Sequence, residues 1–161
     1  MATNGRQTER IEPGSRSQSV NGKAPKRYVM EQQVGFLMRV AMQRHTSIFM
    51  SLMPHNLTQT QFAVVAKLAE VGTTSQNHLG RLVYLDAATT KGVVDRLRMR
   101  KIVTIEINPR DRRHSMVALT KVGARIAKQS INLAHQITTK TLAPLKRNEQ
   151  RAIVRLLKKM S

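Results

Sequence analysis

Two short segments with alternating polar and apolar residues constrain the fold of this chain more than any other feature. Residues 102–107, IVTIEI, alternate β-branched apolar residues with Thr104 and Glu106, and residues 115–120, SMVALT, repeat the alternation. A period of two is typical of β-strands. The turn between the segments contains Asn108, Pro109 and several arginines. The pattern therefore predicts a β-hairpin with a basic tip.

Apolar residues follow helical spacing in most of the remaining chain. The first such run predicts a helix over 28–54, ended by Pro54. Thr58 and Gln61 then have the spacing of a capping box, and Gly72 is a suitable residue to end the helix that they begin. A further helix is predicted from Thr120, and a last one after Asn148.

Residues 75–101 carry the signature of two short helices joined by a tight turn. Ser75 and Asp86 are N-cap candidates for these helices. Two short helices after a supporting one are typical of a helix-turn-helix. Together with the hairpin, they predict a mainly α fold with a small β-hairpin wing, that is, a winged helix-turn-helix.

The second short helix is predicted to have a buried and an exposed face. With about 100° per residue, Thr90, Val93, Val94 and Leu97 fall on one side and Ala88, Lys91, Gly92 and Asp95 on the other. Lys91 could donate to guanine, Thr89 could bond a base edge or a phosphate, and Ala88 and Gly92 allow close approach. Asp95 could orient Lys91. An ordinary solvated helix face explains the same pattern equally well.

The first short helix begins with neutral polar residues. Ser75, Gln76, Asn77 and His78 could present donors to a phosphate together with the helix N-terminus, although capping alone explains them equally well. Nearby arginines could reach the DNA backbone, but each one alone is more often a surface charge: Arg81, Arg96, Arg98 and Arg100.

The charge balance indicates a polyanionic partner. The chain has 28 Lys and Arg against 9 Asp and Glu, a net charge of +19, which favours nucleic acid or an anionic membrane. Aromatic residues make up only 3%, too few for binding single strands by base stacking. Duplex DNA is therefore the predicted partner.

Several classes of protein are disfavoured by composition. The chain has no cysteine, which excludes disulfides, thiol chemistry and cysteine-containing metal sites. No apolar run approaches the roughly 18 to 20 residues of a membrane span, and no secretion signal is evident. We expect a soluble, cytoplasmic, nucleoid-associated protein without membrane contact, metal or other cofactor. The sequence contains no nucleophile motif and no phosphate-binding glycine loop, so we do not expect an enzyme.

Three segments together resemble the MarR family of winged helix-turn-helix regulators. They are LTQTQFAVVAKLAEVG, SQNHLGRLVYLDAATTKGVVDRLRMRKIV and NPRDRRHSMVALTKVG. The family's Asp-x-Arg in the wing, followed by Leu-Thr, is matched by Asp111, Arg113, Leu119 and Thr120. The resemblance covers the chain from about Tyr28 to its C-terminus.

The resemblance implies a dimeric MarR-like architecture, in a chain of four parts. Three parts follow from it: an N-terminal dimerisation helix (28–54), a winged helix-turn-helix DNA-binding domain (55–120) and C-terminal dimerisation helices (121–161). The fourth part, a disordered basic tail (1–27), is predicted from composition, because this segment has almost no apolar residues. Each subunit of the homodimer would read half of a pseudo-palindrome.

The resemblance also implies roles in the wing. Arg113 would enter the minor groove and Asp111 would brace the wing. Arg110 and Arg112 are further candidate DNA contacts, although a solvated loop explains them equally well. The chain departs from many relatives at Lys101, where they have glycine, so the recognition helix is expected to end without a residue suited to a left-handed conformation. It departs also at Gly92, where many have arginine.

Family members usually release DNA when a small ligand, often an aromatic acid, binds between the dimerisation helices and the DNA-binding lobe. The stretch QVGFLMRVAMQRHTSIF with DAATTKGVVDRL resembles a branch that controls aromatic-compound catabolism, including nicotinate and hydroxycinnamoyl-CoA responders. We expect an aromatic acyl-CoA or aromatic acid as effector, first p-coumaroyl-CoA and alternatively hydroxynicotinate. The predicted ligand-binding residues are Arg39, Arg44 and His45, with Phe36, Met38 and Phe49 as walls. Core or surface roles are the more common explanation for each of them.

Of two rival functions, one stays open at this point. Net charge and the basic tail would equally suit a non-specific architectural DNA-binding protein. A zinc-responsive regulator is disfavoured, because the sequence has no compact cluster of His, Asp and Glu.

Overall fold

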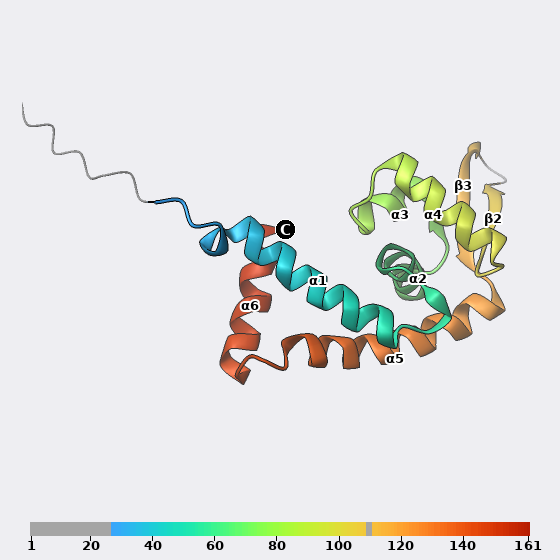
Figure 1. The fold of residues 1–161 in the computed structure, drawn as a ribbon. Helices are drawn as coiled ribbons and strands as arrows, with labels where there is room; N and C mark the ends of the chain where they lie inside the picture. The colour runs from blue at the N-terminus through green and yellow to red at the C-terminus, as the bar shows by residue number, and fades with distance from the viewer. Residues whose placement is uncertain (1–26, 109–110) are drawn as a thin grey trace, which may run out of the picture.

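A computed structural model describes residues 27–108 and 111–161, without the side chains of residues 107–114 (Figure 1). The predicted tail lies outside the described residues except for Arg27, as do the side chains of Arg110, Asp111, Arg112 and Arg113. The helices are η1 (Met30–Gln32), α1 (Val34–Leu52), η2 (Pro54–Asn56), α2 (Gln59–Val71), α3 (Gln76–Leu82), α4 (Ala87–Met99), α5 (Lys121–Leu142) and α6 (Arg147–Met160), where η1 and η2 are short 3₁₀ helices; the strands are β1 (Thr74–Ser75), β2 (Val103–Asn108) and β3 (Asp111–Leu119).

The predicted fold class is confirmed: the described chain is mainly helical with a small antiparallel sheet. Strands β2 and β3 form the predicted hairpin, in a register that pairs Val103 with Leu119. The sheet has the order β1-β3-β2. Strand β1, which the sequence analysis did not predict, adds Thr74 opposite Val117.

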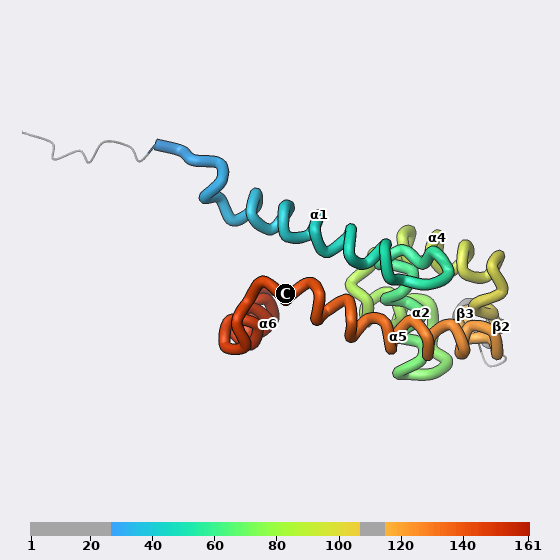
Figure 2. Tube along the Cα trace, turned by 60° about the horizontal axis from the view of Figure 1, so that its bottom comes forward, coloured from blue at the N-terminus to red at the C-terminus, as the bar shows by residue number. Residues whose placement is uncertain are grey.

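The elements form a lobe and an extension (Figures 1 and 2). Helices α2, α3 and α4 and the sheet form the lobe, and α1 and α5 run away from it to α6, which lies at the opposite end of the molecule from α4 and the hairpin. The buried core joins residues of α2, α3, α4 and the sheet with the ends of α1 and α5 that face the lobe. Helix α6 has no buried residue.

The helix starts follow the predicted capping rules. Thr58 and Gln61 form the complete capping box of α2. Ser75 accepts from the His78 amide, and Asp86 accepts from the Thr89 amide. Thr120 caps α5 by accepting from the amide of Gly123. Short-range hydrogen bonds therefore set the start of each helix in the lobe.

The predicted first helix is too long. Helix α1 begins at Val34 rather than Tyr28, because Gln33 has an extended backbone (φ −82°, ψ 132°) after η1. Tyr28 and Met30 are 72% and 49% exposed. Apolar residues at helical spacing therefore do not by themselves set where a helix begins.

The end of α4 adopts a left-handed backbone without a glycine. Lys101 itself takes the left-handed conformation there, with φ 57°. A side chain in this region costs roughly 1 kcal/mol, and glycine avoids that cost. We predict that Lys101→Gly raises the free energy of unfolding by about 1 kcal/mol, measured by urea denaturation. Lys101→Ala removes the same charge but keeps Cβ, so an equal gain in both variants would contradict the backbone explanation.

Candidate DNA interface and ligand cavity

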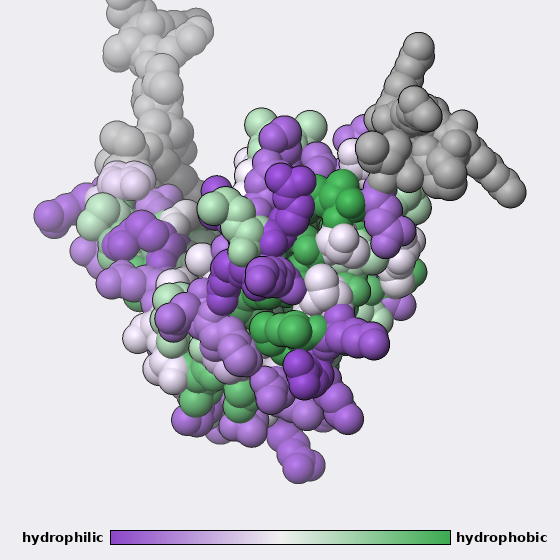
Figure 3. Space-filling model, turned by 90° about the vertical axis from the view of Figure 1, so that its right-hand side faces the viewer, coloured by the Kyte–Doolittle hydropathy of each residue, from purple (hydrophilic) through white to green (hydrophobic). Residues whose placement is uncertain are grey.

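Helix α4 has the two faces that the sequence predicts. Thr90, Val93, Val94 and Leu97 are buried, with exposures of 2% or less. Ala88, Thr89 and Lys91 are exposed on the outer side. The helix packs on α2, α3 and β2, so its outer side remains available to a partner. Figure 3 views the molecule from the side of α4 and the hairpin, and hydrophilic residues cover most of that face.

Lys91 is oriented as predicted. Its Nζ lies 2.8 Å from Oδ2 of Asp95, one turn further along α4. This hydrogen bond lowers the pKa of the Asp95 carboxyl, which keeps the pair charged. The Lys91 side chain is 69% exposed, so its ammonium group keeps donor capacity for a DNA acceptor.

Thr89 has a more restricted role than the sequence suggested. Its hydroxyl donates to Asp86 Oδ2 at 2.6 Å, and its amide donates to Oδ1 at 2.8 Å. These bonds, the hydroxyl first, lower the pKa of the Asp86 carboxyl. Because the hydroxyl proton is used within the cap, Thr89 can only accept a hydrogen bond from DNA.

The Arg96 side chain lies across Gly92. A Cβ atom placed on Gly92 would be 3.5 Å from Arg96 Nη1, so the Arg96 side chain folds back over Gly92. Arg96 is exposed. The Arg96 guanidinium therefore lies over the surface of α4 at Gly92.

The start of α3 presents the predicted polar residues. Asn77 and His78 are exposed, and Ser75 and Gln76 are half-buried. Ser75 Oγ accepts from the His78 amide at 3.3 Å. Arg81 donates to the His78 ring at 3.4 Å. These residues lie at the N-terminal end of α3 in the lobe.

An arginine that sequence reasoning treated as a surface charge instead joins three elements. Arg100, the C-cap of α4, donates to the backbone oxygen of His55 and, at 3.3 Å, to Gln61 Oε1. The His55 ring in turn bonds Gln129 of α5 at 3.0 Å. His55 and Asn56 both have positive φ, 59° and 49°. The end of α4 is therefore tied to the α1–α2 loop and through it to α5.

The six predicted ligand-binding residues do not form one site. The Arg39 guanidinium stacks 5.1 Å from the Phe36 ring, and Met38 lines a groove beside the end of α6. Arg44 donates to the backbone oxygens of Lys140 and Thr141 at the end of α5. Next to it, His45 Nδ1 lies 2.9 Å from Thr141 Oγ1. Phe49 is in the core, 6.3 Å from the His45 ring and 5.9 Å from the Phe62 ring.

A cavity of about 420 Å³ that is open to solvent lies between α2 and α5, with Phe62 in its wall. None of the six predicted residues lines it. Its walls are mostly small or apolar: Phe62, Ala66, Ala69, Glu70, Ile131, Ala134, His135 and Thr138. Glu70 is paired with Lys67 at 2.6 Å. His135 is therefore the lining residue best suited to meet an anionic group. The sequence signal for this cavity is the alanines that line it from both helices.

Two absences concern the described part of the chain only. No three His, Cys, Asp or Glu side chains within it lie close enough to hold a metal ion. Within the same residues, no helix combines the length and apolar character needed to cross a membrane.

The sequence matches a known protein family. Residues 57–115 match the model of the MarR family. The chain is 39% identical over 134 residues to the HTH-type transcriptional repressor NicR of Pseudomonas putida, covering 83% of this chain and 85% of NicR.

Solved structures resemble the whole described fold. The chain is 39% identical to Bordetella bronchiseptica BpsR, with a TM-score of 0.78 over 83% of this chain and 96% of BpsR; that structure concerns regulation of DNA binding by 6-hydroxynicotinic acid. A mutant of MarR from E. coli, complexed with operator DNA, is 25% identical, with a TM-score of 0.72 over 78% of this chain and 91% of that one.

Proposed function

Because this chain belongs to the MarR family of transcriptional regulators, we propose that it binds a pseudo-palindromic duplex-DNA operator as a homodimer and represses transcription until a small aromatic acid releases it. The observation that carries the proposal is α4, whose buried face fixes it in the lobe while Ala88, Thr89 and Lys91 remain exposed beside a hairpin wing. The regulated genes would be those of aromatic catabolism. The regulator itself would act in the cytoplasm.

The proposed DNA contacts divide between groove and backbone. In the major groove, Lys91 and Arg96 would donate to bases or phosphates, and Ala88 would allow the helix to approach closely. At the backbone, Ser75, Gln76 and Asn77 would bind phosphate at the start of α3. In the wing, Asp111 would brace the hairpin while Arg110, Arg112 and Arg113 reach the minor groove.

We predict that Arg113→Ala weakens operator binding by about tenfold or more, because a good arginine contact to DNA contributes about 1–3 kcal/mol. Fluorescence anisotropy with a labelled operator duplex measures the change. Lys140→Ala removes one positive charge from the end of α5 and is expected to leave operator affinity within about twofold. Binding by Arg113→Ala equal to that of the parent would exclude the wing contact.

DNase footprinting separates the regulator from an architectural DNA-binding protein. We expect protection of one palindrome in the DNA upstream of the protein's own gene, at moderate salt. Uniform protection that disappears steeply as salt rises would instead favour non-specific binding.

A second copy of the chain would cover the exposed apolar faces of α1 and α6. These faces carry large apolar side chains with exposures between 37% and 65%: Val34, Leu37, Met38, Met42, Ile153, Leu156, Leu157 and Met160. Their burial between the proposed dimerisation helices, in segments 28–54 and 121–161, would supply the hydrophobic free energy of association. Light scattering is expected to give twice the monomer mass of 18.2 kDa, and a monomer would contradict the dimer.

The effector is proposed to bind in the α2–α5 cavity. A volume of about 420 Å³ suits a single-ring acid, whereas the CoA part of a thioester would have to extend beyond it. The relation of BpsR to 6-hydroxynicotinic acid also supports a hydroxynicotinate-like acid over p-coumaroyl-CoA, which is retained as the alternative. An effector between α2 and α5 would move the lobe against the dimerisation helices.

We predict that His135→Ala weakens binding of 6-hydroxynicotinate about tenfold, because it removes a charge-assisted hydrogen bond to the carboxylate. Isothermal titration calorimetry measures the affinity. Lys128→Ala, on the exposed side of α5, is the control and should bind like the parent. Titrations with p-coumarate and p-coumaroyl-CoA run in parallel, and binding of the thioester alone would replace this assignment.

A further inference from the structure

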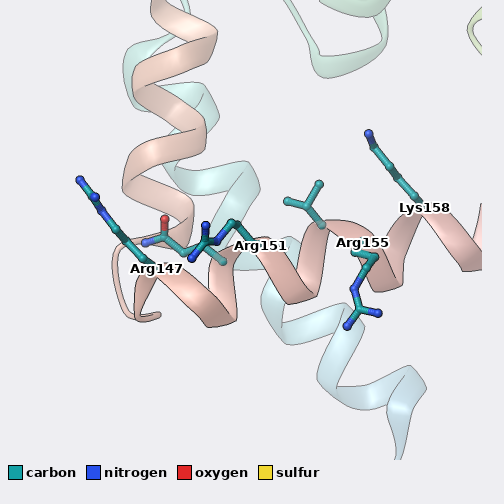
Figure 4. A pocket seen from close by; sticks show the side chains of 6 residues that line it. Arg147, Arg151, Arg155 and Lys158 are labelled. Carbon is teal, nitrogen blue, oxygen red and sulfur yellow. The ribbon is translucent and has the colours of Figure 1, made fainter.

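Helix α6 carries a row of cations on one side. Arg147, Arg151, Arg155 and Lys158 follow spacings of four, four and three residues, and with Gln150 and Val154 they line an open groove of about 610 Å³ (Figure 4). Such spacings place the side chains on one face of a helix, with successive arginines about 6 Å apart along its axis. We refer to these four residues as the α6 cationic face.

Among the described residues, no acidic side chain neutralises the α6 cationic face. The ion pairs in this part of the chain are Lys67 with Glu70 and Lys91 with Asp95, both in the lobe. Glu149, the acidic residue in the first turn of α6, accepts from the backbone amide of Lys146. Like charges four residues apart destabilise a helix. A polyanion bound along the row would relieve this repulsion.

The position of the α6 cationic face excludes it from the groove that α4 would occupy. Figures 1 and 2 show α6 at the opposite end of the molecule from α3, α4 and the hairpin. The cations therefore belong to a second surface, and a DNA segment bound there would be distinct from the segment read by the recognition helix of the same protomer.

Duplex DNA fits this surface better than an anionic membrane. A membrane-bound helix inserts its apolar side into the lipid, and the apolar side of α6, with Ile153, Leu156 and Met160, is the side that the proposed dimer covers. Phosphodiesters require only the cations. Three of the four cations are arginines, whose planar guanidinium groups bind phosphate in a bidentate manner.

We propose that the α6 cationic face is a second duplex-DNA-binding surface, with which an operator-bound dimer holds another DNA segment through phosphate contacts. The surface reads no sequence, because its contacts are to the backbone. A dimer would thereby bridge two segments of the same or of different DNA molecules. This inference goes beyond operator recognition, although its assay depends on the proposed operator binding.

The test uses the full chain as a stoichiometric complex with an immobilised operator duplex taken from the footprint. A second, labelled duplex of unrelated sequence is then added, and its capture is measured at increasing salt. We expect capture by the parent complex. In the variant Arg147→Gln/Arg151→Gln/Arg155→Gln, capture should fall about tenfold or more and the salt dependence should become shallower by about one unit of slope per lost cation.

Two further variants serve as controls. Arg125→Gln/Lys128→Gln/Lys140→Gln removes the same charge from exposed positions of α5 and should keep capture within about twofold of the parent. Replacing the three α6 arginines by lysine keeps the charge and should preserve most of the capture. Circular dichroism and light scattering verify that each variant has the helix content and mass of the parent.

Several outcomes would overturn the inference. These are an operator-bound parent that captures no second duplex, equal loss of capture in the α5 control, or α6-dependent capture of phosphatidylserine vesicles in place of DNA. Failure of the proposed function looks different, since no operator footprint would then be found at all.

Discussion

Gly123→Ala is expected to lower the free energy of unfolding by about 3 kcal/mol or more. A Cβ atom on Gly123 would lie 2.0 Å from the backbone oxygen of Ile102 and 3.0 Å from its carbonyl carbon. Ile102 is 1% exposed and cannot move outward without breaking the core. The backbone of β2 and the start of α5 would have to separate.

The same junction holds further bonds that this separation would break. The Thr120 amide donates to the Ile102 oxygen at 3.0 Å, and the Thr120 hydroxyl donates to the Lys101 oxygen at 2.7 Å. Urea denaturation followed by circular dichroism measures the change.

Gly35→Ala is the matched control for this variant. Gly35 is the second residue of α1, and a Cβ atom added there would have no neighbour within 4 Å among the described residues, so alanine should not lower the free energy of unfolding. A Gly123→Ala protein as stable as the parent would show that the close contact with Ile102 is absent in solution.

Leu97→Ala is expected to cost about 2–5 kcal/mol of folding free energy. Leu97 is fully buried on α4 among Val93, Val94 and Thr90, so its truncation leaves a cavity under the recognition helix. Differential scanning calorimetry measures the loss, and operator affinity should fall with it as the support of α4 weakens.

Met99→Ala is the matched control for Leu97→Ala, because it also truncates an apolar side chain of α4. Met99 is on the same helix but is 82% exposed, and its truncation should change the free energy of unfolding by no more than about 0.5 kcal/mol. Similar losses in both variants would contradict the assigned inward face of α4.

The lobe could be predicted from sequence because its determinants are local. Helical spacing in residues 87–99 identified the buried face of α4, and side chains three residues apart identified the caps at Thr58, Ser75 and Asp86. Alternation identified the hairpin. Family membership confirms the resemblance derived from these same segments, and it also confirms that the chain is a regulator and not an enzyme.

The errors concern features that depend on distant contacts. Residues 28–33 have helical apolar spacing, yet Gln33 has an extended backbone and α1 starts at Val34. Strand β1 has two residues and exists through its pairing with β3. Lys101 takes a backbone conformation that its residue type disfavours, because the chain must turn from α4 into β2.

The candidate ligand site was the hardest part to predict. Arg44 and His45 looked like ligand-binding groups on α1, yet they bond Lys140 and Thr141 at the end of α5. The α2–α5 cavity is instead built from small residues more than sixty positions apart in sequence, such as Ala66 and Ala134. Periodicity within one helix cannot reveal a space between two. The residues predicted for ligand binding therefore stay a prediction.

The ion pair of Lys91 with Asp95 has a consequence for how strongly an operator would be held. A lysine that is already paired exchanges a carboxylate for a DNA acceptor, and Asp95, 2.8 Å from the ammonium group, is left facing the phosphates. Where Lys91 would find no acceptor in the groove, its attraction to the phosphates and the repulsion between Asp95 and the phosphates would largely cancel. Lys91 would add little to adhesion on arbitrary DNA and much to the contrast between a correct and an incorrect base.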